Sequence, residues 1–336
     1  MTLPLSFLDL VHIESGSTSA TALQNAVELA QAAEQLGYTR YWFAEHHNSI
    51  GLASGSPEIM VAHVANQTTR IRVGTGGVML QNHAPLRIAE AFHLLEALHP
   101  GRIDLGLGRA PGTDTLTAYA LRRSEEALRS DQYPSLLAEL LAFDTREFPA
   151  GHPFHQIQVT PTDVKLPPIW LLGSSDFSAQ FAAEVGLGFS FAAHFSQAPS
   201  GPIMKLYRER FSPSQYLDQP HAILAVSVVV GEDAEHAEEL RHIVEIGYAS
   251  LLSGRPYQMP SHEQAKATTL SPEDRERVRA RRQNMFVGDA ASVVAGIREL
   301  ADETQADEVM ITTSLPNQVD RLRTVETIAG EWGLVS

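Results

Sequence analysis

The sequence predicts a (β/α)8 barrel, with a single domain that spans residues 1–336. Two observations support this prediction. Eight β-prone apolar segments alternate with segments of helical periodicity, and the β-prone segments are apolar at nearly every position. Continuous apolarity is typical of parallel strands that are covered on both faces, and eight such units fit a closed barrel in a chain of this size. A doubly wound open sheet is the alternative, but no Gly-x-Gly-x-x-Gly motif follows the first segment.

The predicted strands are runs rich in β-branched, aromatic and other apolar residues. In chain order they cover residues 5–11, 38–45, 72–80, 102–109, 167–174, 186–194, 222–231 and 307–315.

The predicted helices lie between these strands and carry recognisable start and stop signals. Proline opens two of them, at Pro57 and Pro85, where its missing N–H costs nothing. Gly37 stands where a glycine ends a helix, and Asp289 precedes a helix as its N-cap. The expected ranges are 21–36, 57–68, 85–98, a helix from about 116, about 177–184, 289–303 and 319–332.

Two segments do not fit the strand–helix alternation, and we expect them to be insertions after strands 4 and 7. The first, about residues 144–165, is rich in proline and phenylalanine. The second, about residues 247–284, contains the charge-dense run SPEDRERVRARRQN. Such a run is usually the solvated face of a helix, so we expect no chemistry there.

Composition excludes several classes of function. The formal net charge is −15 and no cluster of Lys or Arg stands out, which argues against nucleic acid or anionic membrane as partners. The absence of cysteine excludes disulfides, thiolate nucleophiles and cysteine-ligated metals. No signal peptide is recognisable and no apolar run approaches about 18 residues, so a cytoplasmic location is expected.

In a (β/α)8 barrel the active site lies at the carboxyl-terminal ends of the strands. Unusual polar residues and glycines gather at the predicted ends. They are Glu45, His46 and His47 after strand 2, Gly76 and Gly77 in strand 3 with Asn82 and His83 beyond it, Gly106, Gly108 and Arg109 at strand 4, Ser174 and Ser175 at strand 5, and His194 at strand 6.

A phosphate site is predicted where strand 5 leads into its helix, in the sequence GSSDFSAQ. Free N–H groups and the helix dipole favour an anion there, and Arg109 on the neighbouring strand would supply a charge-assisted clamp. Serine is also simply a good N-cap. The glycines of GTGG and GLGRAPG would let a flat ring lie against the main chain, or they serve barrel curvature alone.

Three interpretations of the Glu-His-His cluster remain open. A metal site needs three or four convergent ligands, whereas neighbouring strand residues point to opposite faces. His46 and His47 would therefore not share one metal unless the chain turns there, and we predict no metal site. The second interpretation is a structural role at a strand end. The third is an imidazole that moves protons beside a bound organic ligand.

Several segments together resemble the bacterial luciferase-like, flavin-dependent monooxygenase family. They are YWFAEHHN, residues 73–114, GSSDFSAQFAAEVGLGFSF and residues 306–329. The resemblance extends in order over nearly the whole chain, and it is most specific where Glu-His-His occurs together with Gly-Arg-x-x-Gly-x-Asp. It is closest to the luciferase-like oxidoreductase branch rather than to the light-emitting subunits.

The resemblance implies a site for reduced FMN at the carboxyl ends of the strands. Arg109 matches the family arginine that grips the FMN phosphate, and Ser175 and Ser178 match hydroxyl positions around it. Ser174 stands where luciferase has an acidic residue. Gly76 and Gly77 match a position that often carries a non-prolyl cis peptide beneath the flavin. His46 matches the histidine implicated in acid–base chemistry, so we expect His46, Glu45 and His47 to be the catalytic group.

The chain also departs from luciferase. Gly108 stands where luciferase has a reactive cysteine, and residues 247–284 contain no match to the mobile lid of the light-emitting subunit. Light emission is therefore not expected, and the substrate is not inherited from the resemblance.

The expected function is that of a two-component monooxygenase. Reduced FMN from a separate flavin reductase would react with O2 to give a C4a-peroxyflavin that oxygenates a small organic substrate. His46 would move a proton, and Glu45 would orient an imidazole. A deazaflavin-dependent hydride-transfer oxidoreductase, a non-catalytic flavin-binding protein and, more remotely, a metal-dependent hydrolase are the alternatives. We expect a transient contact with the reductase and a homodimer, as is common in the family.

Overall fold

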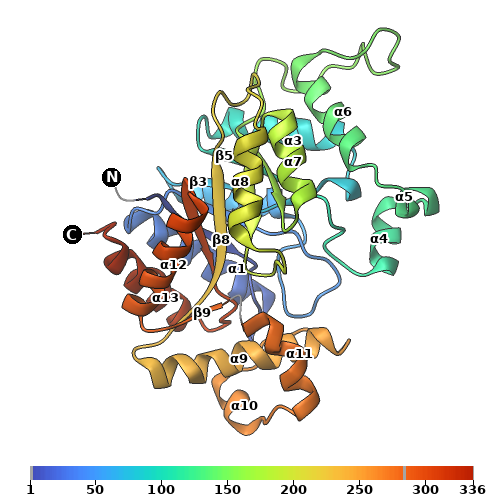
Figure 1. Cartoon of the computed structure of the whole chain (residues 1–336). Coiled ribbons are helices and arrows are strands. Elements are labelled where there is room, and N and C mark those ends of the chain that lie inside the picture. Colours follow the sequence, from blue (N-terminus) through green and yellow to red (C-terminus); the bar gives the residue numbers. More distant parts are fainter. Residues whose placement is uncertain (1–2, 283–284, 336) are drawn as a thin grey trace.

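The structure is a computed structural model that describes residues 3–282 and 285–335. Within that part of the chain, eight parallel strands close into a barrel, because β8 pairs with β10 and β10 pairs with β1 (Figure 1). The barrel strands are β1 (Leu5–Asp9), β2 (Arg40–Phe43), β3 (Arg72–Thr75), β5 (Ile103–Gly108), β6 (Ile169–Gly173), β7 (Gly188–Ala192), β8 (Ala222–Val230) and β10 (Glu308–Thr312). Each lies inside one predicted run, so the predicted (β/α)8 barrel is confirmed.

Two further strands are short. β4 (Val78–Met79) continues the third predicted run after Gly76 and Gly77 and pairs with β5. β9 (Met285–Gly288) was not predicted; it pairs with the last residues of β8, from Ser227 to Val230. Its four residues are only half-buried, and so short a run carries no usable periodicity.

Helices surround the barrel. They are α1 (Ser19–Gln35), α2 (Pro57–Gln67), α3 (Pro85–Leu98), α4 (Thr115–Arg122), α5 (Glu125–Arg129), α6 (Tyr133–Thr145), α7 (Asp176–Val185), α8 (Ser200–Arg210), α9 (Ala234–Leu252), α10 (His262–Ala267), α11 (Pro272–Arg282), α12 (Ala290–Thr304) and α13 (Gln318–Trp332), with a short 3-10 helix η1 (Leu80–Asn82).

The predicted helix signals act as expected. Pro57 and Pro85 open α2 and α3. The Asp289 side chain accepts a hydrogen bond from the backbone N–H of Ser292 at 2.8 Å, which caps α12. Gly37 follows α1 with φ +86°, a conformation that glycine adopts without strain.

The two irregular segments have other limits than the sequence suggested. Asp144 lies inside α6, so the irregular part after strand 4 begins only after Thr145. Gly247 lies inside α9, which starts at Ala234. Leu240, Ile243 and Val244 of α9 are buried at helical spacing, and this periodicity was present in the sequence but was not used. Within the charge-dense run, Pro272–Arg282 form α11, and Gln283 and Asn284 lie outside the described residues.

The α9–α11 segment lies across the carboxyl-terminal end of the barrel, at the bottom of Figure 1. The loop between α9 and α10 is joined to the loop after β1. The Ser15 N–H donates to the Met259 carbonyl at 3.0 Å, and Glu14 and Met259 form an isolated parallel bridge. The insertion therefore packs on the loops that carry the candidate site.

The core has two layers, because successive strand residues point to opposite sides. Outside the strands, Phe7, Tyr41 and Phe189 pack against the helices. Inside the barrel, the buried residues are Leu8, Trp42, Ala44, Trp170, Ile223, Ala225 and Met310.

Charged side chains fill the amino-terminal end of the barrel interior. The Arg40 guanidinium pairs with Asp104 at 3.0 Å and with Glu308 at 2.7 Å, and it lies 4.7 Å from the Trp170 ring centroid. All three charged side chains are buried. Loss of one partner would leave an uncompensated buried charge in this network, which is strongly destabilising. No described helix is long and apolar enough to span a membrane.

Candidate active site

The strand that carries the Glu-His-His cluster directs its side chains alternately into and out of the barrel. Trp42 and Ala44 belong to the barrel interior. Beyond the end of β2, Glu45 contacts Met79 and Asn82, whereas His46 lies near enough to His12 to affect its pKa. The cluster is therefore divided into two parts with different surroundings.

His46 has a buried ring nitrogen, Nδ1, that makes no hydrogen bond within the described part of the chain. Its backbone N–H donates to the Ser54 carbonyl at 3.0 Å, which fixes the main chain. Burial lowers the pKa of His46 to about 4, although the nearby Glu45 carboxylate acts in the opposite direction. The imidazole is therefore neutral near pH 7.

Glu45 is fully buried and accepts hydrogen bonds from two imidazoles. His47 Nε2 lies 2.8 Å from one carboxylate oxygen, and His83 Nε2 lies 3.0 Å from each. The Met79 N–H and the Asn82 amide also donate to it, at 2.9 and 3.3 Å. Burial raises the pKa of Glu45, but the bonds from His83 and His47 outweigh this effect, so its pKa lies below the ordinary value.

This geometry assigns a support role within the cluster. The imidazoles that Glu45 holds are those of His47 and His83, not that of His46. Within the described residues, no group of three or more His, Cys, Asp or Glu side chains is arranged to hold a metal ion.

The peptide bond between Gly76 and Gly77 is cis, as the resemblance led us to expect. Gly77 and its neighbour Gly106 lie in close contact with adjacent main chain, whereas a Cβ on Gly76 would lie 2.6 Å from the Leu8 side chain. A Cβ on Gly77 would lie 2.7 Å from the Gly106 carbonyl oxygen, and one on Gly106 would lie 2.0 Å from the Thr75 carbonyl oxygen. Barrel packing alone therefore requires glycine here, and a role beside a flavin ring stays a prediction.

Arg109 follows β5, and its side chain reaches the start of α7, where the phosphate site was predicted. Its guanidinium carbon is 4.3 Å from the ring centroid of Phe177, in the first turn of α7. Asp131 pairs with the same guanidinium at 3.2 Å, and both side chains are partly exposed.

The three predicted serines surround the same helix start. Ser175 is the N-cap of α7, and its side chain makes no capping bond. A Cβ on Gly173 would lie 2.1 Å from the Ser178 hydroxyl oxygen, so the first turn of α7 sits tightly against the end of β6. Ser174 uses its carbonyl, which accepts a hydrogen bond from the Ser196 hydroxyl at 2.8 Å. Asp176 accepts from the Phe177 N–H at 2.9 Å, so one N–H of this turn is already engaged.

The structure adds His12, which the sequence interpretation missed. His12 follows β1 at the same end of the barrel and is only 2% exposed, and neither ring nitrogen has a hydrogen-bond partner among the described residues. Burial lowers its pKa to about 3, and Arg321 and His46 act in the same direction. Its position directly after the first predicted strand, residues 5–11, was the signal that could have identified it.

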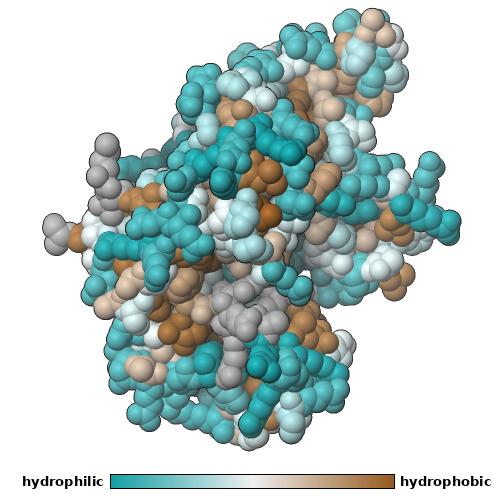
Figure 2. All heavy atoms as spheres, in the orientation of Figure 1, coloured by the Kyte–Doolittle hydropathy of each residue, from teal (hydrophilic) through white to brown (hydrophobic). Residues whose placement is uncertain are grey.

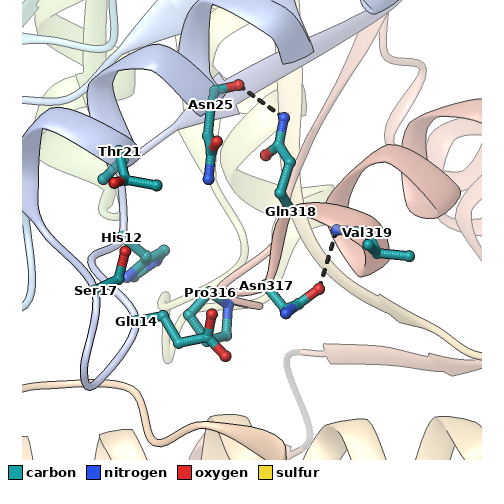
Figure 3. A pocket seen from close by; sticks show the side chains of 10 residues that line it. His12, Glu14, Ser17, Thr21, Asn25, Pro316, Asn317, Gln318 and Val319 are labelled. Carbon is teal, nitrogen blue, oxygen red and sulfur yellow. Dashed lines mark hydrogen bonds between the residues drawn. The ribbon is translucent and has the colours of Figure 1, made fainter.

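Two cavities occur near this end of the barrel. One, of about 280 Å³, is lined by His12 and lies between α1 and α13 (Figure 3). The other, of about 680 Å³, lies beside residues 193–200, with Arg277 and Phe286 on its far side. None of the nine predicted site residues lines either cavity.

Comparisons with known proteins agree in pointing to one family. The model of the family described as luciferase-like monooxygenase matches residues 3–308. A luciferase-like monooxygenase of Escherichia coli (strain K12) is 39% identical over 97% of this chain and 96% of its own length. An N-acetyl-S-alkylcysteine monooxygenase of Bacillus subtilis (strain 168) is 35% identical over 94% of each chain.

Solved structures extend this similarity to the fold. The crystal structure of apo-MsnO8 superposes with a TM-score of 0.88 at 33% identity, over 99% of this chain and 98% of the other. At 18% identity, the oxygenating constituent of 3,6-diketocamphane monooxygenase from Pseudomonas putida, in complex with FMN, has a TM-score of 0.70 over 98% of each chain. An F420-dependent secondary alcohol dehydrogenase has 0.68 at 13% identity, over 98% and 99%. At such identities these last two show the fold alone.

Proposed function

The chain belongs to the luciferase-like monooxygenase family, and from this premise we propose that it is an FMN-dependent, two-component monooxygenase. Reduced FMN would come from a separate flavin reductase, and O2 would oxygenate a small organic substrate. The observation that carries the proposal is the meeting of Arg109 with the first turn of α7, because it combines a guanidinium with a helix N-terminus.

The residues at this point fit the phosphate of FMN. Ser175 has a hydroxyl that is not used for capping, and the Gly173–Ser178 contact leaves no room for a larger residue between β6 and α7. The partly exposed Arg109 guanidinium pairs with Asp131. A dianionic phosphate would replace Asp131 as the partner of this guanidinium. The Gly76–Gly77 segment, inside the same strand ends, would lie against the ring system.

When bound, reduced FMN supplies two electrons and the position at which O2 is activated. The residues of this chain then have separate tasks. His46, neutral and with a free ring nitrogen, would accept or pass on a proton at the substrate. Glu45 would keep His47 and His83 in fixed orientations beside it. The α9–α11 segment would help to exclude water from the carboxyl end of the barrel.

The FMN proposal is tested by comparing FMN with riboflavin, which lacks the phosphate. We expect Arg109→Ala to weaken FMN binding about tenfold to a hundredfold, the range for a lost charge-assisted hydrogen bond, and to leave riboflavin binding unchanged. Arg129→Ala is the control, since its exposed partner is Glu125 on the same helix. Equal losses for both ligands would contradict a phosphate role for Arg109.

A deazaflavin-dependent hydride transfer is the second candidate, because the F420-dependent alcohol dehydrogenase shares the fold. Titration of the purified protein with FMN and with F420 separates the two. Tighter binding of F420, without oxygen uptake in the presence of a flavin reductase, would favour hydride transfer. A non-catalytic flavin carrier would bind FMN without oxygenating any member of a panel of aldehydes, ketones, sulfonates, aromatic compounds and thioethers.

A homodimer, a transient reductase contact and a cytoplasmic location belong to the same proposal. Large apolar side chains on the neighbouring helices α2 and α3 support the dimer: Ile59, Leu94 and Leu98 are 65%, 52% and 60% exposed.

A further inference from the structure

The smaller cavity, of about 280 Å³, lies between the loop after β1 and the loop after β10 (Figure 3). It is far larger than the roughly 10–15 Å³ that one water molecule needs. Seven of the ten residues that line it have polar side chains. The lining residues are His12, Glu14, Ser17, Thr21, Ala22, Asn25, Pro316, Asn317, Gln318 and Val319.

His12 brings an unused donor and an unused acceptor to this cavity. A neutral imidazole has one of each, and both nitrogens of His12 are buried without a partner in the described structure. His93, which is 3% exposed, shows how a buried histidine is normally accommodated in this chain. Its two nitrogens lie 3.1 Å from the Pro161 carbonyl and 3.1 Å from Asp144. Unpaired burial is costly, so the nitrogens of His12 indicate a missing partner.

Gln318 supplies a second unused acceptor from the opposite wall. Its Nε2 donates to the Asn25 carbonyl at 3.0 Å, as Figure 3 shows. Its Oε1 is buried and has no partner among the described residues. The cavity therefore offers one donor and two acceptors that nothing within the described chain satisfies.

The charges around the cavity favour a neutral ligand group. The Glu14 carboxylate lies on one side, whereas the first turns of α1 and α13, with their partial positive charge, lie on the others. A carboxylate would be repelled by Glu14, and an ammonium would be opposed by both helix starts. A neutral group with an N–H and a C=O matches both the charges and the free hydrogen-bonding atoms.

We propose that this cavity binds the amide of an N-acylated substrate, and that the substrate is an N-acyl amino acid with a thioether side chain. This rests on the proposed monooxygenase function and names its substrate class. The related N-acetyl-S-alkylcysteine monooxygenase supports the choice of thioether. In such a molecule only two carbons separate the amide nitrogen from the sulfur.

Main-chain hydrogen bonds join the loop that carries His12 to the segment that carries His46, and His46 is near enough to help lower the pKa of His12. The Ala53 N–H donates to the Val11 carbonyl at 3.0 Å, and the His46 N–H donates to the Ser54 carbonyl at 3.0 Å. Residues 52–54 therefore tie the loop after β1 to the end of β2. The loop that carries His12 and the segment that carries His46 are therefore parts of one hydrogen-bonded unit.

The test measures equilibrium binding by calorimetry, without flavin, to the full chain. The probes are N-acetyl-S-methylcysteine and S-methylcysteine, which differ in the acetyl group and in the positive charge that the free amino group carries. The wild type is expected to bind the acetylated probe at least about tenfold more tightly. His12→Phe keeps a buried ring but removes both nitrogens, and it should reduce this preference to within about twofold.

His93→Phe is the matched control, because it removes an equally buried imidazole far from the cavity and should keep the full preference. Gln318→Leu is the second variant, should His12→Phe fail to fold; it should also reduce the preference. The proposal is overturned if the wild type binds both probes equally or not at all, or if both cavity variants retain the tenfold preference. A failure of FMN to bind would instead contradict the monooxygenase proposal, and it would leave this measurement intact.

Discussion

At the residue scale, the candidate site divides its histidines into two kinds. His47 and His83 donate to the buried Glu45 carboxylate, so their orientation is fixed. His12 and His46 have buried ring nitrogens without partners in the described chain. A protein that only needed stability would not leave such groups unpaired, because each costs about 1–3 kcal/mol. The second kind is therefore where ligand contacts are expected.

The His46 role predicts a separation of binding from chemistry. His46→Ala should leave the FMN dissociation constant nearly unchanged and should lower substrate oxygenation about 100-fold or more, the usual effect of a lost acid–base group. Oxygen uptake with release of hydrogen peroxide should continue. Parallel measurements of product, peroxide and oxygen uptake check this. Unchanged product formation would contradict the role of His46 in proton transfer.

The same burial predicts how stability depends on pH. The pKa of His12 falls from the usual 6.5 to about 3. Between these values the unfolded chain binds a proton that the folded chain does not, so this residue lowers the free energy of unfolding as the pH falls below 6.5. The loss is up to about 1.4 kcal/mol per pH unit.

His12→Phe should therefore lose less stability between pH 7 and pH 5 than the wild type. Urea unfolding at both values measures the difference. Comparing the two proteins cancels contributions that they share, such as that of His83, whose pKa is raised by its bond to Glu45 even though burial acts against it. Parallel pH profiles would show that His12 is not held neutral.

At the scale of elements, the site depends on how closely β3 and β5 approach each other. The Thr75 hydroxyl donates to the Gly106 carbonyl at 2.9 Å, and the Gly106 N–H lies 3.1 Å from the same hydroxyl. There is no space for a side chain on Gly106. The neighbouring strands that close the barrel prevent these two from separating.

Gly106→Ala should consequently lower the free energy of unfolding by about 1–3 kcal/mol, as overpacking does, and should weaken FMN binding by displacing the Gly76–Gly77 segment. Gly330→Ala is the control, since Gly330 lies in α13 and a Cβ there would meet nothing within 4 Å. That variant should be up to about 1 kcal/mol more stable. Chemical denaturation measures the free energy of unfolding of both variants. A Gly106→Ala variant as stable as the wild type would refute the prediction.

At the scale of the whole molecule, the surface bears on assembly. Figure 2 shows a mostly hydrophilic face with scattered apolar side chains, whereas Ile59, Leu94 and Leu98 project from α2 and α3. Exposed apolar groups on adjoining helices are typical of interfaces. We expect a dimer, and we expect Leu94→Asp with Leu98→Asp to convert it to a monomer without loss of helix content.

Light scattering coupled to size-exclusion chromatography measures this change in mass. Leu116→Asp is the control, because Leu116 is 78% exposed but lies on α4. A wild-type protein that is monomeric at tens of micromolar, or a double variant that stays dimeric, would show that these helices are not the interface.

Much of this architecture was decided by the sequence alone. Eight apolar runs that alternate with helical segments predicted the barrel. Continuous apolarity and hydrophobic periodicity are local properties of the chain, so they can be read from its sequence. The helix starts at Pro57, Pro85 and Asp289 were determined in the same way, since capping acts within one turn. The strand-end rule then placed Arg109, Ser175 and His46 at one end of the barrel.

Only the tertiary structure decided which of these side chains have hydrogen-bond partners among the described residues and which do not. That Glu45 holds His47 and His83 depends on residues 38 positions apart meeting at two strand ends. His12 and His46 have ring nitrogens without partners among the described residues because they are buried, and this burial, which lowers their pKa values, is set by all the surrounding elements at once. The position of a residue within a predicted strand shows which end of the strand it occupies. Partner and protonation state arise from long-range packing, which no local pattern contains.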